Sequence, residues 1–273
     1  MFIIKVPGIN GLKKTLGCEE SGNAILKALY EIHSNEQGKE INVKNLDLEE
    51  IHLNNSNLEL TNELIYKNSF ETFEEHPKSV FLGGDHSISY SITRAFFDYC
   101  ENRGKEPCLI VFDAHPDLMK PIDSDSEKTP THEEWLRGLI EDGFPVKNIL
   151  LIGIRNSDPE EIRFIKEKGI RTISINQLNE NLEEVTDIIT EFANEKELYV
   201  SIDIDVLDPA FAPSTGYLEP GGLTSRQFLY ILQRINKIKN LRAVDIVEIN
   251  REKDKENNNM TIKLGAKILS ELI

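Results

Sequence analysis

The chain has 273 residues, of which 39% are hydrophobic and 29% are charged, which is enough for one large α/β domain with a substantial core. Its formal net charge of −16 argues against nucleic acid or an anionic membrane as a partner and would draw small cationic molecules toward an acidic cleft, although solubility is the simpler reason for the excess of acids. No apolar run approaches the roughly 20 residues that cross a bilayer, so we expect a cytoplasmic protein.

Short apolar runs alternate along the chain with segments of helical periodicity. In the segment 21–32, Ala24, Ile25, Ala28 and Leu29 are spaced to lie on one face of a helix. Strands are expected at the amino terminus and at 49–53, 80–82, 109–112, 149–154, 172–175, 198–204 and 241–247. Helices are expected at 21–32, 58–73, 87–101, 131–142, 159–168, 182–194, 224–236 and 257–273, and the polar patch 252–259 is expected to be a solvated turn. This alternation predicts an α/β fold, a three-layer α/β/α sandwich with a mostly parallel central sheet, in a single domain over residues 1–273.

Two carboxylates stand close together near the end of the expected strand 198–204. Asp203 and Asp205 are two positions apart, so in a strand they project to the same side, while Ile202 and Ile204 fill the other side. Two acids in a partly desolvated site repel each other unless a proton or a cation compensates them. A divalent metal ion is the simplest compensation.

Two further expected strands also end in possible metal ligands. Asp113, His115 and Asp117 follow the strand 109–112 at alternate positions, and His86 follows the strand 80–82 after two glycines. The six candidate ligands are His86, Asp113, His115, Asp117, Asp203 and Asp205. Six donors are too many for one tetrahedral zinc ion and suit two neighbouring divalent ions, and the oxygen-rich mixture favours manganese.

Three motifs of the chain resemble those of the ureohydrolase family, the arginases and agmatinases. They are Gly83-Gly84-Asp85-His86-Ser87, Asp113-Ala114-His115-Pro116-Asp117, and the block from Ser201 through Pro213, Thr215-Gly216 and Gly221-Gly222 to Thr224. One Asp-x-His-x-Asp alone would be weak, whereas all three motifs in register span most of residues 80 to 250. The resemblance implies an arginase-like fold and a hydrolase of linear amidines with two Mn²⁺ ions per chain.

The resemblance also implies how the ligands are shared between the two ions. One ion would be held by His86, Asp113, Asp117 and Asp203, and the other by Asp113, His115, Asp203 and Asp205. Asp113 and Asp203 would therefore bridge the ions. Asp85 is expected to orient the imidazole or its loop, and Asp208 to form a turn before Pro209.

Three residues are expected to handle the substrate and its protons. Glu248 ends the strand 241–247 and matches the family's glutamate that binds the substrate guanidinium, a planar fork that a carboxylate holds through two hydrogen bonds. His132 matches the histidine that shuttles protons between solvent and the metal site and helps to bind the substrate, with a capping or surface histidine as the alternative. Asp117, besides binding metal, would pass a proton to the leaving amine, so that the products are urea and an amine.

The part of the substrate beyond its guanidine group is less well defined by the sequence. Residues 118–131 lack the Asn- and Ser-rich segment with which arginases hold the α-carboxylate and α-amino group. The acids in and around this interval suit a cationic tail, so agmatine, giving putrescine, is the first choice. Arginine or another guanidino or formimino acid stays open, because Lys120, Lys128 or Arg155 could anchor a carboxylate.

The chain departs from the agmatinase pattern at three places. Tyr217-Leu218 stands where agmatinases tend to have Thr-Pro, Glu133 where they tend to have glycine, and Arg251 where the family usually has proline. Two other classes of function are open: a one-zinc enzyme such as an amide deacetylase, and a catalytically idle metal-binding or assembly subunit. The intact set of six ligands argues against both. From the relatives we also expect a homo-oligomer, a trimer or a hexamer.

Overall fold

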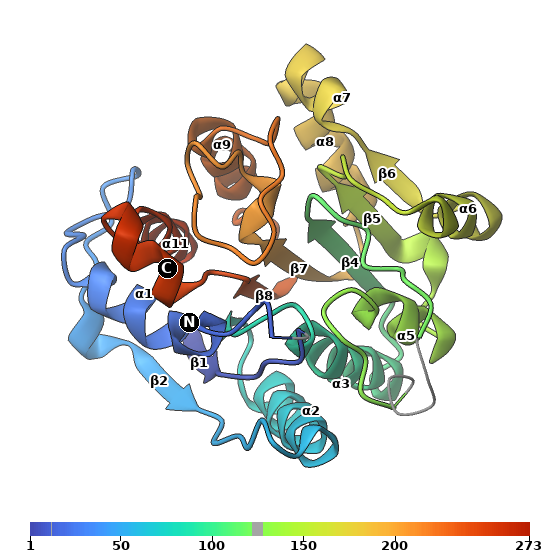
Figure 1. Cartoon of the computed structure of the whole chain (residues 1–273), viewed down its shortest axis with the longest axis horizontal. Coiled ribbons are helices and arrows are strands. Elements are labelled where there is room, and N and C mark those ends of the chain that lie inside the picture. Colours follow the sequence, from blue (N-terminus) through green and yellow to red (C-terminus); the bar gives the residue numbers. More distant parts are fainter. Residues whose placement is uncertain (12, 122–127) are drawn as a thin grey trace.

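Eight parallel strands form one sheet in residues 1–11, 13–121 and 128–273, the part of the chain that this computed structural model describes. Their order across the sheet is β2-β1-β3-β8-β7-β4-β5-β6 (Figure 1). The strands are β1 (Phe2–Val6), β2 (Asp47–Glu50), β3 (Ser79–Gly83), β4 (Pro107–Phe112), β5 (Ile149–Ile152), β6 (Arg171–Ile173), β7 (Glu197–Asp203) and β8 (Leu241–Val247). Every neighbouring pair is parallel, so all the carboxyl ends lie at the same edge.

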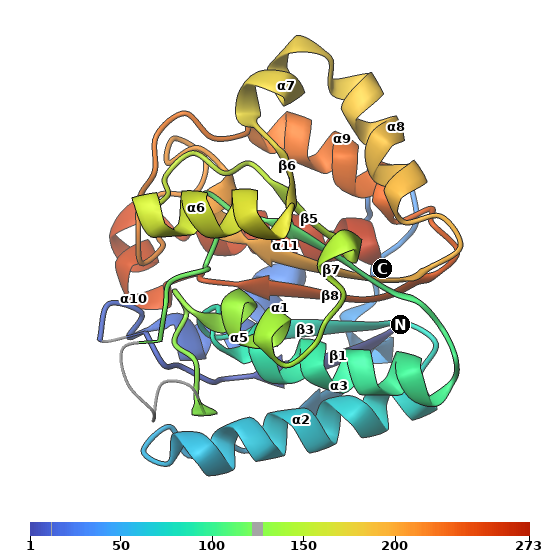
Figure 2. The same cartoon turned by 90° about the vertical axis from the view of Figure 1, so that its right-hand side faces the viewer.

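Helices cover both faces of the sheet because alternate strand side chains are apolar on both. In β4, Cys108, Ile110 and Phe112 join one buried cluster, and Leu109 and Val111 join the other. The first cluster includes α1 (Ser21–Leu29), α8 (Leu182–Phe192), α9 (Ser225–Ile235) and α11 (Met260–Leu272). The second includes α2 (Leu58–Glu75), α3 (Ile88–Asn102), α5 (Trp135–Glu141) and α6 (Pro159–Lys168). Figure 2 shows α2 and α3 on the side of the sheet opposite to α8 and α9, and the predicted α/β/α sandwich is confirmed.

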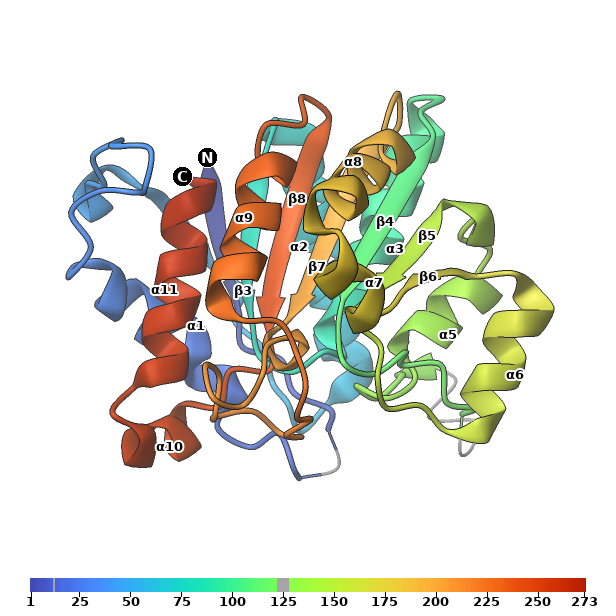
Figure 3. The same cartoon turned by 90° about the horizontal axis from the view of Figure 1, so that it is seen from above.

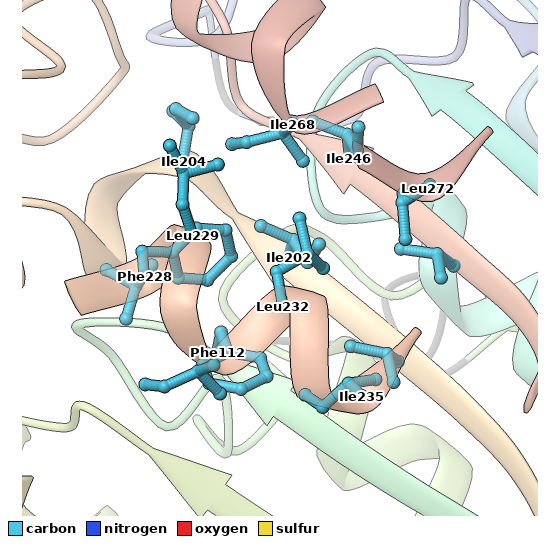
Figure 4. Packing of buried hydrophobic residues seen from close by; sticks show 14 of the residues in the cluster. Phe112, Ile202, Ile204, Phe228, Leu229, Leu232, Ile235, Ile246, Ile268 and Leu272 are labelled. Atoms are coloured by element: carbon cyan, nitrogen blue, oxygen red, sulfur yellow. The ribbon is translucent and has the colours of Figure 1, made fainter. Parts of the chain in front are cut away.

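Helix α9 packs on the ends of the two strands that carry most of the acidic motif residues. The rings of Phe228 and Phe112 meet edge to face, with centroids 5.4 Å apart, and Leu229 and Leu232 lie beside Ile202 (Figure 4). An edge-to-face aromatic pair contributes about 0.5–1.5 kcal/mol beyond the burial of its area. Because Phe112 and Ile202 immediately precede Asp113 and Asp203, this apolar packing also holds the strand ends from which the acids project.

Two element boundaries differ from their expected positions, one of them because of a helix cap. The strand expected at 172–175 ends one residue before Ser174, because the Ser174 hydroxyl accepts the amide of Gln177 and caps α7 (Ile175–Glu180). The helix expected from residue 131 begins only at Trp135. None of the helices in the described ranges is long and apolar enough to cross a membrane.

The polar patch 252–259 is mostly exposed, as its composition predicts, but it is largely helical and contains one buried acid. It contains the end of α10 (Arg251–Asp254) and a 3₁₀ turn. Asp254 is fully buried, and its carboxylate accepts the amides of Thr261 at 3.1 Å and Ile262 at 2.7 Å. One acid within the patch therefore satisfies two orphan amides in the first turn of α11.

The four central strands bring the motif residues to one place at the carboxyl edge. Phe112 of β4 pairs with Ile202 of β7, and Asp203 of β7 pairs with Val247 of β8. On the other side of β8, Ile246 pairs with Leu82 of β3. The segments that follow these strands, which carry the predicted ligands and Glu248, therefore meet at the edge where the loops gather in Figure 3.

A charged residue lies in the middle of β8, on a fully buried part of the sheet. The carboxylate of Asp245 accepts hydrogen bonds from the hydroxyls of Ser89, Tyr199 and Ser201, each at 2.7 Å, and from the amide of Ile202 at 3.2 Å. Four donors satisfy the charge that burial would otherwise make costly.

We expect Asp245→Ala to lower the free energy of unfolding by at least about 3 kcal/mol, because four buried donors lose their acceptor together. Urea denaturation in the presence of EDTA measures this. Asp187→Ala is the matched control, because Asp187 is 68% exposed in an ion pair with Arg234 and surface pairs contribute about 0–1 kcal/mol. Equal effects of the two substitutions would contradict a structural role for Asp245.

Candidate metal centre

His86 lies in a tight connection between β3 and α3. A Cβ atom on Gly84 would lie 1.9 Å from the carbonyl oxygen of Gly8, so only glycine allows the two segments to approach this closely. Asp85 holds the same loop, since its Oδ2 accepts the hydroxyl of Thr15 at 2.7 Å. Of the two roles expected for Asp85, the structure supports the orientation of the loop.

The two histidines of the motifs both turn Nδ1 toward the acids. His86 Nε2 lies 2.9 Å from the hydroxyl of Ser201, which itself donates to Asp245. His115 Nε2 lies 3.4 Å from Oε1 of Glu219. A partner at Nε2 holds the proton on that nitrogen and leaves the Nδ1 lone pair free to bind a cation.

Three carboxylates surround Nδ1 of His86. The distances are 2.9 Å to Oδ2 of Asp117, 3.1 Å to Oδ2 of Asp113 and 3.4 Å to Oδ2 of Asp203. Both Nδ1 of His86 and Oδ2 of Asp113 are buried without a hydrogen-bond partner among the residues described. Buried polar atoms of this kind need a partner, and a divalent cation bound among them would supply it.

A second group of ligand atoms adjoins the first. Nδ1 of His115 lies 2.9 Å from Oδ2 of Asp205 and 3.6 Å from Oδ1 of Asp113. Two sets have ligand atoms within 4.8 Å of one another, namely His86 with Asp113 and Asp203, and Asp113 with His115 and Asp205. Asp113 belongs to both sets, as a bridging ligand would, whereas Asp203 belongs to the first set only.

Asp205 reaches this group by a route that alternation along a strand does not predict. Strand β7 ends at Asp203, and Ile204–Val206 forms a 3₁₀ turn instead of continuing the strand. Oδ1 of Asp203 accepts the amide of Asp205 at 2.7 Å, and Oδ1 of Asp205 accepts the amide of Ala114 at 2.9 Å. The pairing of the two acids was expected, but the turn and its capping hydrogen bond produce it.

Asp117 differs from the other predicted ligands in its hydrogen-bond partner and in its position relative to the clustered ligand atoms. Its Oδ2 accepts the indole N–H of Trp135 at 2.8 Å and touches His86, but it belongs to neither set of clustered ligand atoms. Its backbone is left-handed, with φ of 53°, and Glu248 shares this feature with φ of 64°. Such backbone is costly for residues other than glycine and concentrates at functional sites.

The charges of the cluster shift the pKa values of its members. Burial raises the pKa of Asp203 and of Asp205, and neighbouring aspartates raise both further. Burial and the Asp113 carboxylate raise the pKa of Asp117 to about 7. Burial opposes protonation of His115, but its contacts with Asp113 and Asp205 outweigh this and raise its pKa to about 12. Without metal, the cluster therefore holds protons that a metal ion would displace.

A cavity of about 210 Å³ opens beside these ligands. Glu248 and His132, both predicted from the sequence, line it and are nearly fully buried. Oε1 of Glu248 accepts the amide of His86 at 2.9 Å, and burial followed by the charge of Asp85 raises the pKa of Glu248. The ring of His132 stacks on Tyr217, with centroids 5.6 Å apart. The alternative of a surface histidine at position 132 is therefore wrong.

Arg155, one of the possible carboxylate anchors, is fully engaged elsewhere. Its guanidinium donates to the carbonyl oxygens of Asp205 at 2.7 Å and Glu219 at 2.6 Å, and to four further carbonyls. It therefore fixes the loop that carries Asp205. Lys128 lines a separate cavity, and Lys120 does not line this one. The acidic segment 122–127, expected to face a cationic tail, lies outside the described residues.

Sequence reasoning missed four supporting residues: Ser201, Glu219, Trp135 as a partner of Asp117, and Asp245. Only Asp245 had a usable signal, because an acid inside the apolar run 243–247 of a buried strand requires internal donors. The other three contacts join segments far apart in the chain, and no spacing within the sequence indicates them.

Comparison with known proteins agrees with this arrangement. The model of the Arginase family matches residues 1–273. The chain belongs to the arginase family. An arginase 1 described as mitochondrial, from Oryza sativa subsp. indica, is 32% identical over 200 residues, which cover 73% of this chain and 56% of that protein. The chain thus spans little more than half the length of such relatives.

Two further proteins match over most of both chains. The arginase of Staphylococcus aureus (strain MRSA252) is 30% identical over 285 residues, which cover 94% of this chain and 91% of that protein. The solved formimidoylglutamase of Bacillus subtilis has a TM-score of 0.87 at 24% identity, covering 99% of this chain and 85% of that one. The predicted arginase-like fold is therefore confirmed. Because proteins named arginase and formimidoylglutamase both resemble this chain, the fold alone does not identify its substrate.

We expect the metal-free chain to lose stability as the pH rises from about 5 to about 8, because its folded state then binds more protons than its unfolded state. Asp117, with its pKa raised from 3.8 to about 7, contributes the lower part of this range. His115, with its pKa raised from 6.5 to about 12, contributes the upper part. Thermal unfolding in EDTA across this range measures the slope.

Manganese should reverse the sign of that slope, because metal and protons compete for the same ligand atoms. Asp205→Asn serves as the control: it removes one of the repelling acids, so it should stabilise the metal-free chain and reduce the gain from manganese. Slopes of the same sign with and without manganese would contradict the metal centre.

Proposed function

We propose that the chain is a dinuclear metal hydrolase that releases urea from a guanidino compound, with agmatine as substrate and putrescine as the amine product. The observation that carries this proposal is the lining of the cavity. Two histidines and three aspartates of the metal centre line one side, and no lysine or arginine among the described residues lines any part. A cavity with this charge suits a substrate that is cationic at both ends.

Glu248 would bind the guanidinium group. It faces the cavity, and no lysine or arginine of the described chain pairs with it. A buried carboxylate without a cationic partner is unfavourable. A substrate guanidinium would compensate its charge and would match its geometry through two parallel hydrogen bonds. The left-handed backbone of Glu248 is consistent with a side chain held in one required direction.

His132 and Asp117 would handle the protons. Both ring nitrogens of His132 are buried and have no hydrogen-bond partner in the described part of the chain, so the ring is free to exchange a proton inside the cavity. Asp117, held at Oδ2 by Trp135, would take a proton from the attacking water and give it to the leaving nitrogen. When bound, the two ions would supply the Lewis acidity that makes water a nucleophile near neutral pH.

The lining of the cavity supports agmatine over a guanidino acid. Besides the metal centre and Glu248 it includes Glu133, whose carboxylate would repel a substrate carboxylate. Of the three expected carboxylate anchors, Arg155 donates every N–H to backbone carbonyls, and neither lysine lines the cavity.

Arginine is the second candidate, because the curated relatives named above are arginases. Lys14 is the cation that would serve it, since its Nζ lies 4.3 Å from the centre of the Tyr217 ring at the cavity wall. Arginine would require this lysine to reach past the ring toward the α-carboxylate.

For the metal we propose manganese, because carboxylate oxygens outnumber imidazoles in the ligand set. A single domain over residues 1–273 is supported by one continuous sheet and by the family match over the same residues. Association into a homo-oligomer of three or six chains and a cytoplasmic location stay proposals from the sequence.

Urea release by the manganese-loaded protein tests the proposed function for the guanidino compounds, and formamide release is measured for formimidoylglutamate, because cleavage of a formimino group yields formamide instead of urea. We expect kcat/KM for agmatine to exceed the values for arginine, 4-guanidinobutyrate and formimidoylglutamate by about tenfold or more, because a charged tail lacking its partner in the cavity costs about 1.5–3 kcal/mol. Asp205→Ala should abolish release from all four compounds. A preference for arginine would overturn the choice of agmatine, and no urea from any compound, with two metals bound, would overturn the proposed activity.

A further inference from the structure

Two of the three positions at which the chain departs from the agmatinase pattern contact each other. The hydroxyl of Tyr217 donates to Oε1 of Glu133 at 2.8 Å, although 84 positions separate them in the sequence. Both residues line the cavity beside the metal centre. The two departures from the agmatinase pattern therefore form one hydrogen-bonded pair in the cavity lining.

Glu133 offers an uncompensated negative charge to the cavity. Its side chain is 39% exposed, it makes no ion pair with a lysine or arginine of the described chain, and its Oε2 has no hydrogen-bond partner there. Two other acids that line the cavity hold backbone amides. Both oxygens of Glu161 accept amides, at 2.9 and 2.8 Å, and the exposed Asp158 caps α6. Glu133 instead has an oxygen to spare for a ligand, and Tyr217, which also lines the cavity, holds its carboxylate there.

Tyr217 links this carboxylate to the guanidinium end of the cavity. The preceding residue, Gly216, lies so close to Glu248 that a Cβ atom there would be 3.2 Å from Oε2 of that glutamate. The Tyr217 ring stacks on His132 and meets His115 edge-on at 5.9 Å between centroids. A methylene chain that begins at Glu248 can therefore follow the ring and end at Glu133.

We propose that Glu133 and Tyr217 form a tail subsite in which the Glu133 carboxylate binds the distal ammonium of the substrate and the Tyr217 hydroxyl holds that carboxylate in place. This inference rests on the proposed function and names the residues that select its substrate. An ammonium has three donors, and Oε2 of Glu133 accepts one of them while Oε1 keeps the hydroxyl of Tyr217. The guanidinium and the ammonium would each pair with one glutamate of the cavity lining, Glu248 and Glu133 respectively.

The test compares agmatine with n-butylguanidine, which has the same chain without the terminal amine. In Glu133→Gln the amide oxygen still accepts the Tyr217 hydroxyl, so only the charge is lost. We expect KM for agmatine to rise about tenfold and KM for n-butylguanidine to change less than about twofold, because only agmatine loses a charge-assisted hydrogen bond. Tyr217→Phe, which frees the carboxylate, should raise KM for agmatine about threefold.

Two control variants separate the subsite from general electrostatics. Asp158→Asn removes an equal charge from the same wall and keeps a residue that caps helices well. It should change KM for agmatine less than about twofold, because that charge faces solvent. Lys14→Gln removes the cation beside Tyr217. A loss of arginine turnover in that variant alone would show that Lys14, and not Glu133, binds the end of the substrate beyond its guanidinium group.

Three results would overturn the inference. Equal rises in KM for agmatine and n-butylguanidine would show that Glu133 does not contact the tail. A fall in kcat for both substrates at constant KM would mean that Glu133 acts through His132, whose Nε2 lies 3.7 Å from its Oε1. If the wild type releases no urea, calorimetric binding of agmatine to the wild type and to Glu133→Gln still decides, and equal affinities would overturn the subsite separately from the activity.

Discussion

Mutual repulsion among buried carboxylates is the constraint on which the rest of this structure depends. Asp113, Asp203 and Asp205 stand at the ends of adjacent parallel strands, where little water can screen their charges. Each accepts one backbone amide from the same edge, donated by His115, Asp205 and Ala114 respectively. These amides hold the acids in place and offset part of the repulsion. The remainder is offset by protons in the metal-free chain or by bound cations, so the stability of the folded state and the binding of metal are coupled.

A chain of hydrogen bonds links the metal centre to the interior of the sheet. Asp245 in β8 accepts the hydroxyl of Ser201 in β7, and that hydroxyl contacts Nε2 of His86 after β3. Three strands are thus joined by one chain of hydrogen bonds that ends in a ligand. The imidazole orientation is therefore set inside the sheet. A substitution at Asp245 would disturb the metal centre without touching it.

The sequence predicted the sheet and its functional edge well, because strand periodicity and ligand motifs are local. It predicted less well wherever a side chain overrides periodicity. Asp203 ends β7 by accepting an amide in a 3₁₀ turn, Ser174 caps α7, and Asp254 is buried at the start of α11. The hydrogen bond between Tyr217 and Glu133 was not predictable at all, since both positions stood out singly as departures but nothing in the sequence paired them.

The metal centre and the proposed tail subsite are built by different means, and this separates chemistry from specificity. The metal centre consists of residues that follow central strands, so the sheet and the packing of α9 beneath it fix their positions. The proposed tail subsite consists of loop residues, Glu133 after the interval 118–131 and Tyr217 in the loop that Arg155 holds. Loops accept substitutions that central strands cannot. A change of substrate can therefore occur without a change in the metal ligands, and in this chain the six predicted ligands match the motifs quoted above, whereas two of the three departures lie in the proposed tail subsite.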